Sequence, residues 1–125
     1  MDLLAKSPPH RTPTALIVEQ QRLVVPFLAS VLRNAGVHTV VAYGATRTAF
    51  ARTKPDVVIL GMDMSAVRPF ELLRRTRRAT ATARIVVITR CDDPAWNAVA
   101  YALGADTILG PSADSRALAS AVLAS

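Results

Sequence analysis

Short apolar runs rich in β-branched residues alternate with segments of helical periodicity along most of this chain, and no other feature restricts the fold as much. Parallel strands need long crossover connections, which helices usually provide. Strict alternation therefore predicts one α/β domain with a parallel sheet covered by helices on both faces. The predicted strands cover residues 15–18, 38–42, 57–60, 85–89 and 107–109.

Local signals place the helices between these strands. Apolar residues recur at spacings of three and four in the first of them, which ends at 34–36. Its expected inward stripe is Leu23, Val24, Phe27, Leu28, Val31 and Leu32. Pro26 suggests that this helix begins there, with Val25 extended and the preceding loop lengthened. Asp93 and Pro94 form an N-cap and first-position pair. The other predicted helices cover 45–52, 69–78, 94–104 and 112–123.

Length and composition are those of a single compact domain. The chain has 125 residues, of which 51% are hydrophobic and 19% charged. Residues 1–13 contain three prolines and no periodicity, so we expect a disordered tail followed by a domain at 14–125. The sequence has neither an apolar run long enough to cross a membrane nor a signal-peptide pattern. With a single cysteine, Cys91, these features favour a cytoplasmic protein that does not contact a membrane.

In open parallel sheets, ligands bind outside the carboxyl ends of the strands. The residues of interest are therefore 19–21, 61–65, 89–91 and 110–112. The chain resembles the receiver domain of bacterial response regulators, the CheY-like family, over the whole stretch from Thr14 to Leu123. The run from Pro55 to Leu60, the pair Ile88–Thr89 and the triplet 104–106 carry the resemblance. It implies a doubly wound, flavodoxin-like (βα)5 sheet of order 2-1-3-4-5, and a role in two-component signal transduction rather than enzymatic catalysis.

The resemblance also implies a site, which this sequence keeps only in part. Receivers accept a phosphoryl group on an aspartate, with magnesium held by acidic side chains and a lysine and a hydroxyl stabilising the transferred group. Thr89 keeps the hydroxyl. The acceptor aspartate corresponds to Gly61, and the acidic pair to Glu19 and Gln20. The lysine corresponds to Pro111, or to Gly110 if the register slips by one. We therefore expect a degenerate pocket without metal or cofactor.

Three residues near this pocket admit two interpretations each. Asp63 is either an unconventional phosphoacceptor or a loop carboxylate that caps a turn. Arg90 replaces a small residue of the family; it either reaches Glu19 or Asp63, imitating a signalling state, or faces solvent. Cys91 is either a redox sensor or an ordinary reduced thiol. Separately, Ile108 occupies the place of the family's aromatic switch residue, which suggests that the switch is no longer used.

Two surfaces are candidates for contact with partners. The net charge is +6, and a basic patch is expected on or beside the helix at 69–78: Arg68, Arg74, Arg75, Arg77 and Arg78. It is either a solvated face or a phosphate-binding surface for nucleic acid. Trp96 and Tyr101, on the helix at 94–104, are interface candidates if exposed and core residues if not.

The sequence as a whole thus predicts a receiver-like module that binds a protein partner, or itself as a dimer, without phosphorylation. The expected surface is formed by the helix at 94–104, the strand at 107–109 and the last helix. Such a module would regulate transcription through a partner or an output domain that this sequence lacks. An active receiver phosphorylated at Asp63 and an arginine-dependent nucleic-acid binder are the alternatives.

Overall fold

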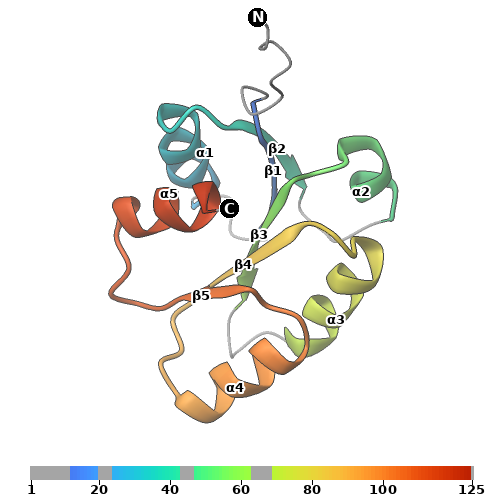
Figure 1. Cartoon of the computed structure of the whole chain (residues 1–125). Helices are drawn as coiled ribbons and strands as arrows, with labels where there is room; N and C mark the ends of the chain where they lie inside the picture. Colours follow the sequence, from blue (N-terminus) through green and yellow to red (C-terminus); the bar gives the residue numbers. More distant parts are fainter. Residues whose placement is uncertain (1–11, 20–23, 43–46, 63–68, 125) are drawn as a thin grey trace, which may run out of the picture.

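The protein forms a five-stranded parallel sheet with helices on both faces (Figure 1). The computed structural model describes residues 12–19, 24–42, 47–62 and 69–124. The strands are β1 (Thr14–Val18), β2 (His38–Ala42), β3 (Val57–Met62), β4 (Arg84–Thr89) and β5 (Thr107–Leu109). The helices are α1 (Val25–Asn34), α2 (Arg47–Thr53), α3 (Pro69–Ala79), α4 (Pro94–Ala102) and α5 (Ser115–Leu123). The strand order is β2-β1-β3-β4-β5, which confirms the predicted topology.

The central strands are apolar at nearly every position because both faces of the sheet are covered. Ile17 of β1 lies between Val41 of β2 and Ile59 of β3, and both Ile17 and Ile59 are fully buried. Successive side chains of a strand point to opposite faces. Each central strand therefore contributes to two separate cores, and its sequence has no polar alternation.

The two cores assign the helices to the two faces of the sheet. Val58 and Leu60 of β3 pack in one core with residues of α2, α3 and α4, including Phe50, Leu73 and Trp96. Val57 and Ile59 pack in the other with residues of α1 and α5, including Leu28, Leu32, Leu118 and Val122. Figure 1 shows α1 and α5 together on one side of the sheet and the remaining helices on the other.

The start of α1 differs from the sequence prediction. Val25 is the first helical residue rather than an extended one, and Pro26 lies within the first turn. Proline is tolerated there because the first backbone N–H groups of a helix have no acceptor within it. Phe27 is 58% exposed, so the predicted inward stripe was wrong at this position. The buried residues of α1 are Val25, Leu28, Ala29 and Leu32, and the predicted Val24 and Val31 are partly buried against the same core. Leu23 lies outside the described residues.

Other boundaries differ from the prediction by a few residues, and two of them have a clear consequence. Helix α5 starts at Ser115 rather than at residue 112, because the side chain of Asp114 accepts a hydrogen bond from Ala117 N and caps the helix. Strand β3 continues to Met62, which places Gly61 inside the strand. The carbonyl of Pro13, in the expected tail, accepts a hydrogen bond from His38 N at 2.9 Å, while residues 1–11 lie outside the described part.

None of the helices in the described segments has the length and apolar character that a membrane crossing requires.

Candidate functional site

The candidate site lies at the carboxyl edge of the sheet, where three neighbouring strands end. Glu19 follows β1 directly, and its backbone N–H donates to Ala42 O at 3.3 Å. Gly61 is near the end of β3, and Thr89 is the last residue of β4, paired with Met62. Because β1, β3 and β4 are adjacent, these residues meet at one place. Gln20 and Asp63, also predicted for this pocket, lie outside the described residues.

The side chain of Glu19 lies over Gly61. A Cβ atom built on Gly61 would lie 2.6 Å from Glu19 Cδ and 3.0 Å from Oε2, and still closer to Oε1. Real side chains do not approach this closely. The carboxylate of Glu19 therefore fills the space that any side chain on residue 61 would need. The longer acid after β1 and the missing side chain on β3 fit each other as a pair.

Thr89 begins a chain of local hydrogen bonds that fixes the loop from β4 to α4. Its Oγ1 accepts from Cys91 N at 3.0 Å, Cys91 Sγ accepts from Asp93 N at 3.4 Å, and Asp93 Oδ1 accepts from Ala95 N at 3.0 Å. Each bond links a side chain to the backbone two residues later, and the last one caps α4. Thr89 and Cys91 are both buried. The Thr89 oxygen thus accepts one hydrogen bond within its own loop.

The remaining predicted pocket residues bring no cation over Gly61. Arg90 is exposed and makes no ion pair within the described segments, which favours the solvent-facing interpretation. Pro111 is exposed as well, and Gly110 accepts a hydrogen bond from Ala113 N through its carbonyl at 3.1 Å. Ile108 is half-buried and packs against the core that contains Trp96.

The described residues do not fit the magnesium ion that the resemblance implies. Magnesium prefers several oxygen ligands in octahedral geometry. Across residues 12–19, 24–42, 47–62 and 69–124, no three His, Cys, Asp or Glu side chains are grouped as metal ligands. Glu19 contributes a carboxylate, but it occupies the place where a second carboxylate, on residue 61, would stand.

The predicted surface residues separate into exposed and structural ones. Arg74, Arg75 and Arg78 are exposed, and Arg68 lies outside the described residues. Trp96 is a core residue whose ring packs on Phe70, with centroids 5.2 Å apart and planes tilted by 40°. Tyr101 is 49% exposed, which leaves it as the interface candidate of the pair.

Arg77 was predicted as part of the surface patch but holds three elements together. Its Nη1 donates to the carbonyls of Thr80, Ala81 and Ala83 at 3.2, 3.4 and 2.9 Å. Its Nη2 donates to Gly104 O at 2.6 Å and to Asp106 Oδ2 at 2.8 Å. The guanidinium therefore connects the end of α3 with the starts of β4 and β5. Charge counting alone cannot separate such a residue from its exposed neighbours.

Comparisons with known proteins decide the family. The model of the response regulator receiver domain matches residues 15–123. The chain belongs to this family. A LuxR-family response regulator from Aurantimonas sp. SI85-9A1 is 26% identical, with a TM-score of 0.70, over 86% of this chain and 79% of that one. A receiver domain protein from Clostridium thermocellum is 20% identical, with a TM-score of 0.74, over 88% and 90% of the two chains.

A third solved structure is a Burkholderia pseudomallei response regulator described as holding a phosphorylated aspartic acid, a calcium ion and citrate. It is 19% identical, with a TM-score of 0.70, over 90% of this chain and 67% of that one. None of the curated proteins compared with the chain matches it. This receiver domain thus has the fold of its family and its place in two-component signalling, while position 61 carries a hydrogen atom in place of a side chain.

The pairing of Glu19 with Gly61 is the feature that sequence reasoning missed. In the sequence, the lengthened carboxylate at Glu19 and the missing carboxylate at Gly61 look like two separate losses of function. A signal was present, because the two positions end adjacent strands of the predicted sheet. A lengthened side chain beside a deleted one conserves volume, as packed protein interiors require.

Proposed function

We propose that this receiver domain signals by phosphorylation-independent protein–protein interaction in the cytoplasm. The observation that carries the proposal is the Glu19 carboxylate lying in the space of a side chain on residue 61. A carboxylate nucleophile on β3 could enter this space only if the half-buried Glu19 side chain moved out of it. The site is filled by the protein itself and does not await a phosphoryl group.

The electrostatics of the pocket support the same proposal. Phosphoryl transfer depends almost entirely on positioning and on cations that stabilise the transferred group. Gly110 and Pro111 supply no cation where the family has its lysine, and Arg90 points to solvent. Regulation would then come from partner concentration, or from a ligand that shifts a population.

The surface formed by α4, β5 and α5 is the proposed contact with a partner or with a second copy. Helix α4 carries no charged residue in its first or last turn, and Tyr101 and Val99 on it are 49% and 44% exposed. Exposed aromatic residues on an uncharged helix are typical of interface centres. The output of such contact would be transcriptional regulation through a partner or an attached output domain.

Treatment with acetyl phosphate and magnesium is expected to leave the protein unmodified. The reason is the missing nucleophile at position 61 together with the missing cation at positions 110 and 111. Intact-mass spectrometry at neutral pH checks this, with a receiver that retains its acceptor aspartate as the positive control. A phosphoryl adduct mapped to Asp63, Asp56 or Glu19 would establish an active receiver with an unconventional acceptor and would overturn the proposal.

Replacing Tyr101 with serine is expected to weaken self-association by at least about tenfold without changing the melting temperature, because a central aromatic residue at an interface contributes about 2 kcal/mol or more. Sedimentation velocity over a concentration series measures the effect. Phe27→Ser is the matched control, since Phe27 is 58% exposed on α1, which is not one of the three elements of the proposed surface. An equal loss in both variants, or a wild type that stays monomeric throughout, would count against this surface.

A further inference from the structure

The amino edge of the sheet, opposite the candidate site, gathers basic side chains. Helices α1, α2 and α3 end at this edge, and each has arginine in its last turn. Lys54 and Arg84 add two cations at the starts of β3 and β4. The described basic residues of this edge are Arg33, Arg52, Lys54, Arg77, Arg78 and Arg84. Its described acidic residues are Asp56 and Asp106, so six positive charges face two negative ones, a net of plus four.

The opposite edge has the reverse balance. Its described acidic residues are Glu19, Glu71, Asp92, Asp93 and Asp114, against Arg47, Arg90 and Arg116, a net of minus two. An overall excess of basic residues would not by itself place positive and negative side chains at opposite edges of the sheet. Basic residues at helix C-termini do stabilise the helix dipole by about 0.3–1 kcal/mol each. That explanation extends to Lys54, which directly follows α2 and whose N–H donates to Phe50 O at 2.9 Å, but not to Arg84, which lies in β4.

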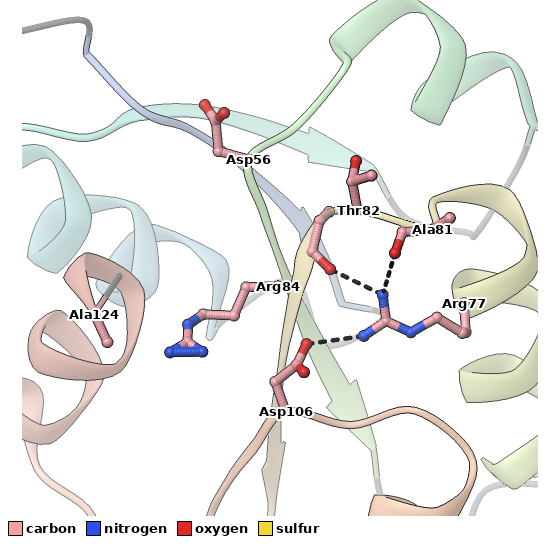
Figure 2. Close-up of a pocket in the computed structure, with 8 residues that line it drawn as sticks. Asp56, Arg77, Ala81, Thr82, Arg84, Asp106 and Ala124 are labelled. Carbon is pink, nitrogen blue, oxygen red and sulfur yellow. Dashed lines mark hydrogen bonds and ion pairs between the residues drawn. The ribbon is translucent and has the colours of Figure 1, made fainter. Parts of the chain in front are cut away.

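A hollow of about 480 Å³ lies within this basic edge. Small residues form much of its wall, among them Ala81, Ala83 and Ala124. Figure 2 shows the side chain of Arg84 extending into it between Asp106 and Ala124. Pockets of this volume accommodate small ligands or single side chains of a partner.

Of the two arginines that line this hollow, Arg84 is the one whose guanidinium can still bind a ligand. The guanidinium of Arg77 is already engaged with Asp106 and four backbone carbonyls. Figure 2 shows its bonds to Asp106 and to the carbonyl of Ala81. Asp106 Oδ2 also accepts from Ile85 N at 2.8 Å, and Asp56 Oδ2 accepts from Thr14 N at 2.8 Å. Arg84 is half-buried and makes no side-chain hydrogen bond or ion pair within the described segments. A guanidinium in this state can bind a carboxylate through two parallel hydrogen bonds.

The charges favour a carboxylate over a chain of phosphates. The four ionisable residues lining the hollow are Asp56, Asp106, Arg77 and Arg84, so the hollow itself is neutral. A nucleic-acid duplex presents closely spaced phosphates and would press several of them against the two aspartates. An acidic peptide can place one carboxylate on Arg84 and others on exposed cations such as Arg78 or Lys54.

We infer that the amino edge of this receiver domain is a docking surface for an acidic peptide segment of a partner protein, with Arg84 as its anchor. The surface adjoins the α4-β5-α5 surface, since Asp106 directly precedes β5 and Ala124 directly follows α5, but it lies at the edge of the sheet opposite the pocket at Gly61. The inference therefore does not depend on whether the domain is phosphorylated.

Fluorescence anisotropy with labelled hexaglutamate tests the inference on the full chain. We expect saturable binding that weakens as salt is added, and no binding of labelled hexaglutamine. Arg84→Gln should lower the affinity by about tenfold or more, as expected for loss of a charge-assisted pair. Arg116→Gln is the matched control, since it makes the same charge change on an exposed residue of α5 at the opposite edge. It should change the affinity by less than about twofold.

Several outcomes would overturn the inference. They are equal losses in the Arg84 and Arg116 variants, no binding of hexaglutamate by the wild type, and equal binding of hexaglutamine. A short DNA duplex that binds more tightly than hexaglutamate and is released by Arg84→Gln would make this edge a nucleic-acid surface instead. If Arg84→Gln lowers the melting temperature, Arg78→Gln on the exposed end of α3 supplies the second measurement, with an expected loss of about threefold. An unchanged affinity in that variant would then count against the surface.

Discussion

Replacing Arg77 with methionine is expected to lower the free energy of unfolding by about 3 kcal/mol. The substitution keeps most of the apolar stem and removes a guanidinium that donates to four carbonyls and to Asp106. Hydrogen bonds from a charged donor contribute about 1.5–3 kcal/mol each when both groups are buried. The side chains of Arg77 and Asp106 are 26% and 41% exposed, so water would replace part of what is lost. The expected loss in the free energy of unfolding is therefore well below five times the contribution of one such hydrogen bond.

Urea denaturation of both proteins at pH 7 measures this difference. Arg78→Met is the matched control, because Arg78 is the next residue of α3, exposed, and outside the hydrogen-bond network of Arg77. Its expected effect is below about 0.5 kcal/mol, as for most exposed substitutions. Similar losses in the two variants would mean that Arg77 acts only as one charge among several on α3.

Arg77 also illustrates what sequence reasoning cannot separate. Five arginines in or near one helix look alike in composition and in charge pattern. What distinguishes Arg77 is the backbone of Gly104, which passes next to it with a φ of +122°. A Cβ atom on Gly104 would lie 2.9 Å from Arg77 Nε and 3.0 Å from Cγ. That contact joins positions far apart in the chain, so it follows from the folded arrangement and from no local pattern.

The architecture, in contrast, was predictable because it depends on local signals that agree with one another. The strands 38–42 and 107–109 have the predicted bounds, and Asp93 caps α4 as its position before Pro94 suggested. Predictions failed where two local rules competed. Helix α5 could begin at Ser112 or after Asp114, and only the Asp114 side chain reaches a backbone N–H of the helix.

The sequence predicted where the site lies and which of the family's residues are missing from it, but not how its side chains pack. Parallel topology places Glu19, Gly61 and Thr89 at one edge, and the adjacent ends of their strands confirm this. The direction in which the Glu19 side chain points depends on free space above β3. That space exists only because residue 61 is glycine, and the sequence of either strand alone does not reveal it.

The Gly61→Asp substitution tests this packing and is expected to lower the free energy of unfolding by about 2 kcal/mol at pH 7 in the absence of divalent ions. The new side chain would enter the space that Glu19 holds. Two carboxylates about 4 Å apart repel by roughly 4 kcal/mol at an effective dielectric constant of 20. Glu19 is half-buried and can swing outward at its flexible end, so we expect about half of that value.

Two further variants separate crowding from charge. Gly61→Ala adds only a methyl group, and we expect it to cost about 1 kcal/mol or less, since only the end of Glu19 must move. Glu19→Gln combined with Gly61→Asp keeps the crowding and removes the repulsion. It should recover most of the stability lost in Gly61→Asp, as a double-mutant cycle would show. A cycle with no coupling between the two positions would mean that Glu19 does not lie over Gly61 in solution. The side-chain space at position 61 would then be open to a ligand, and the main support for a phosphorylation-independent receiver would be removed.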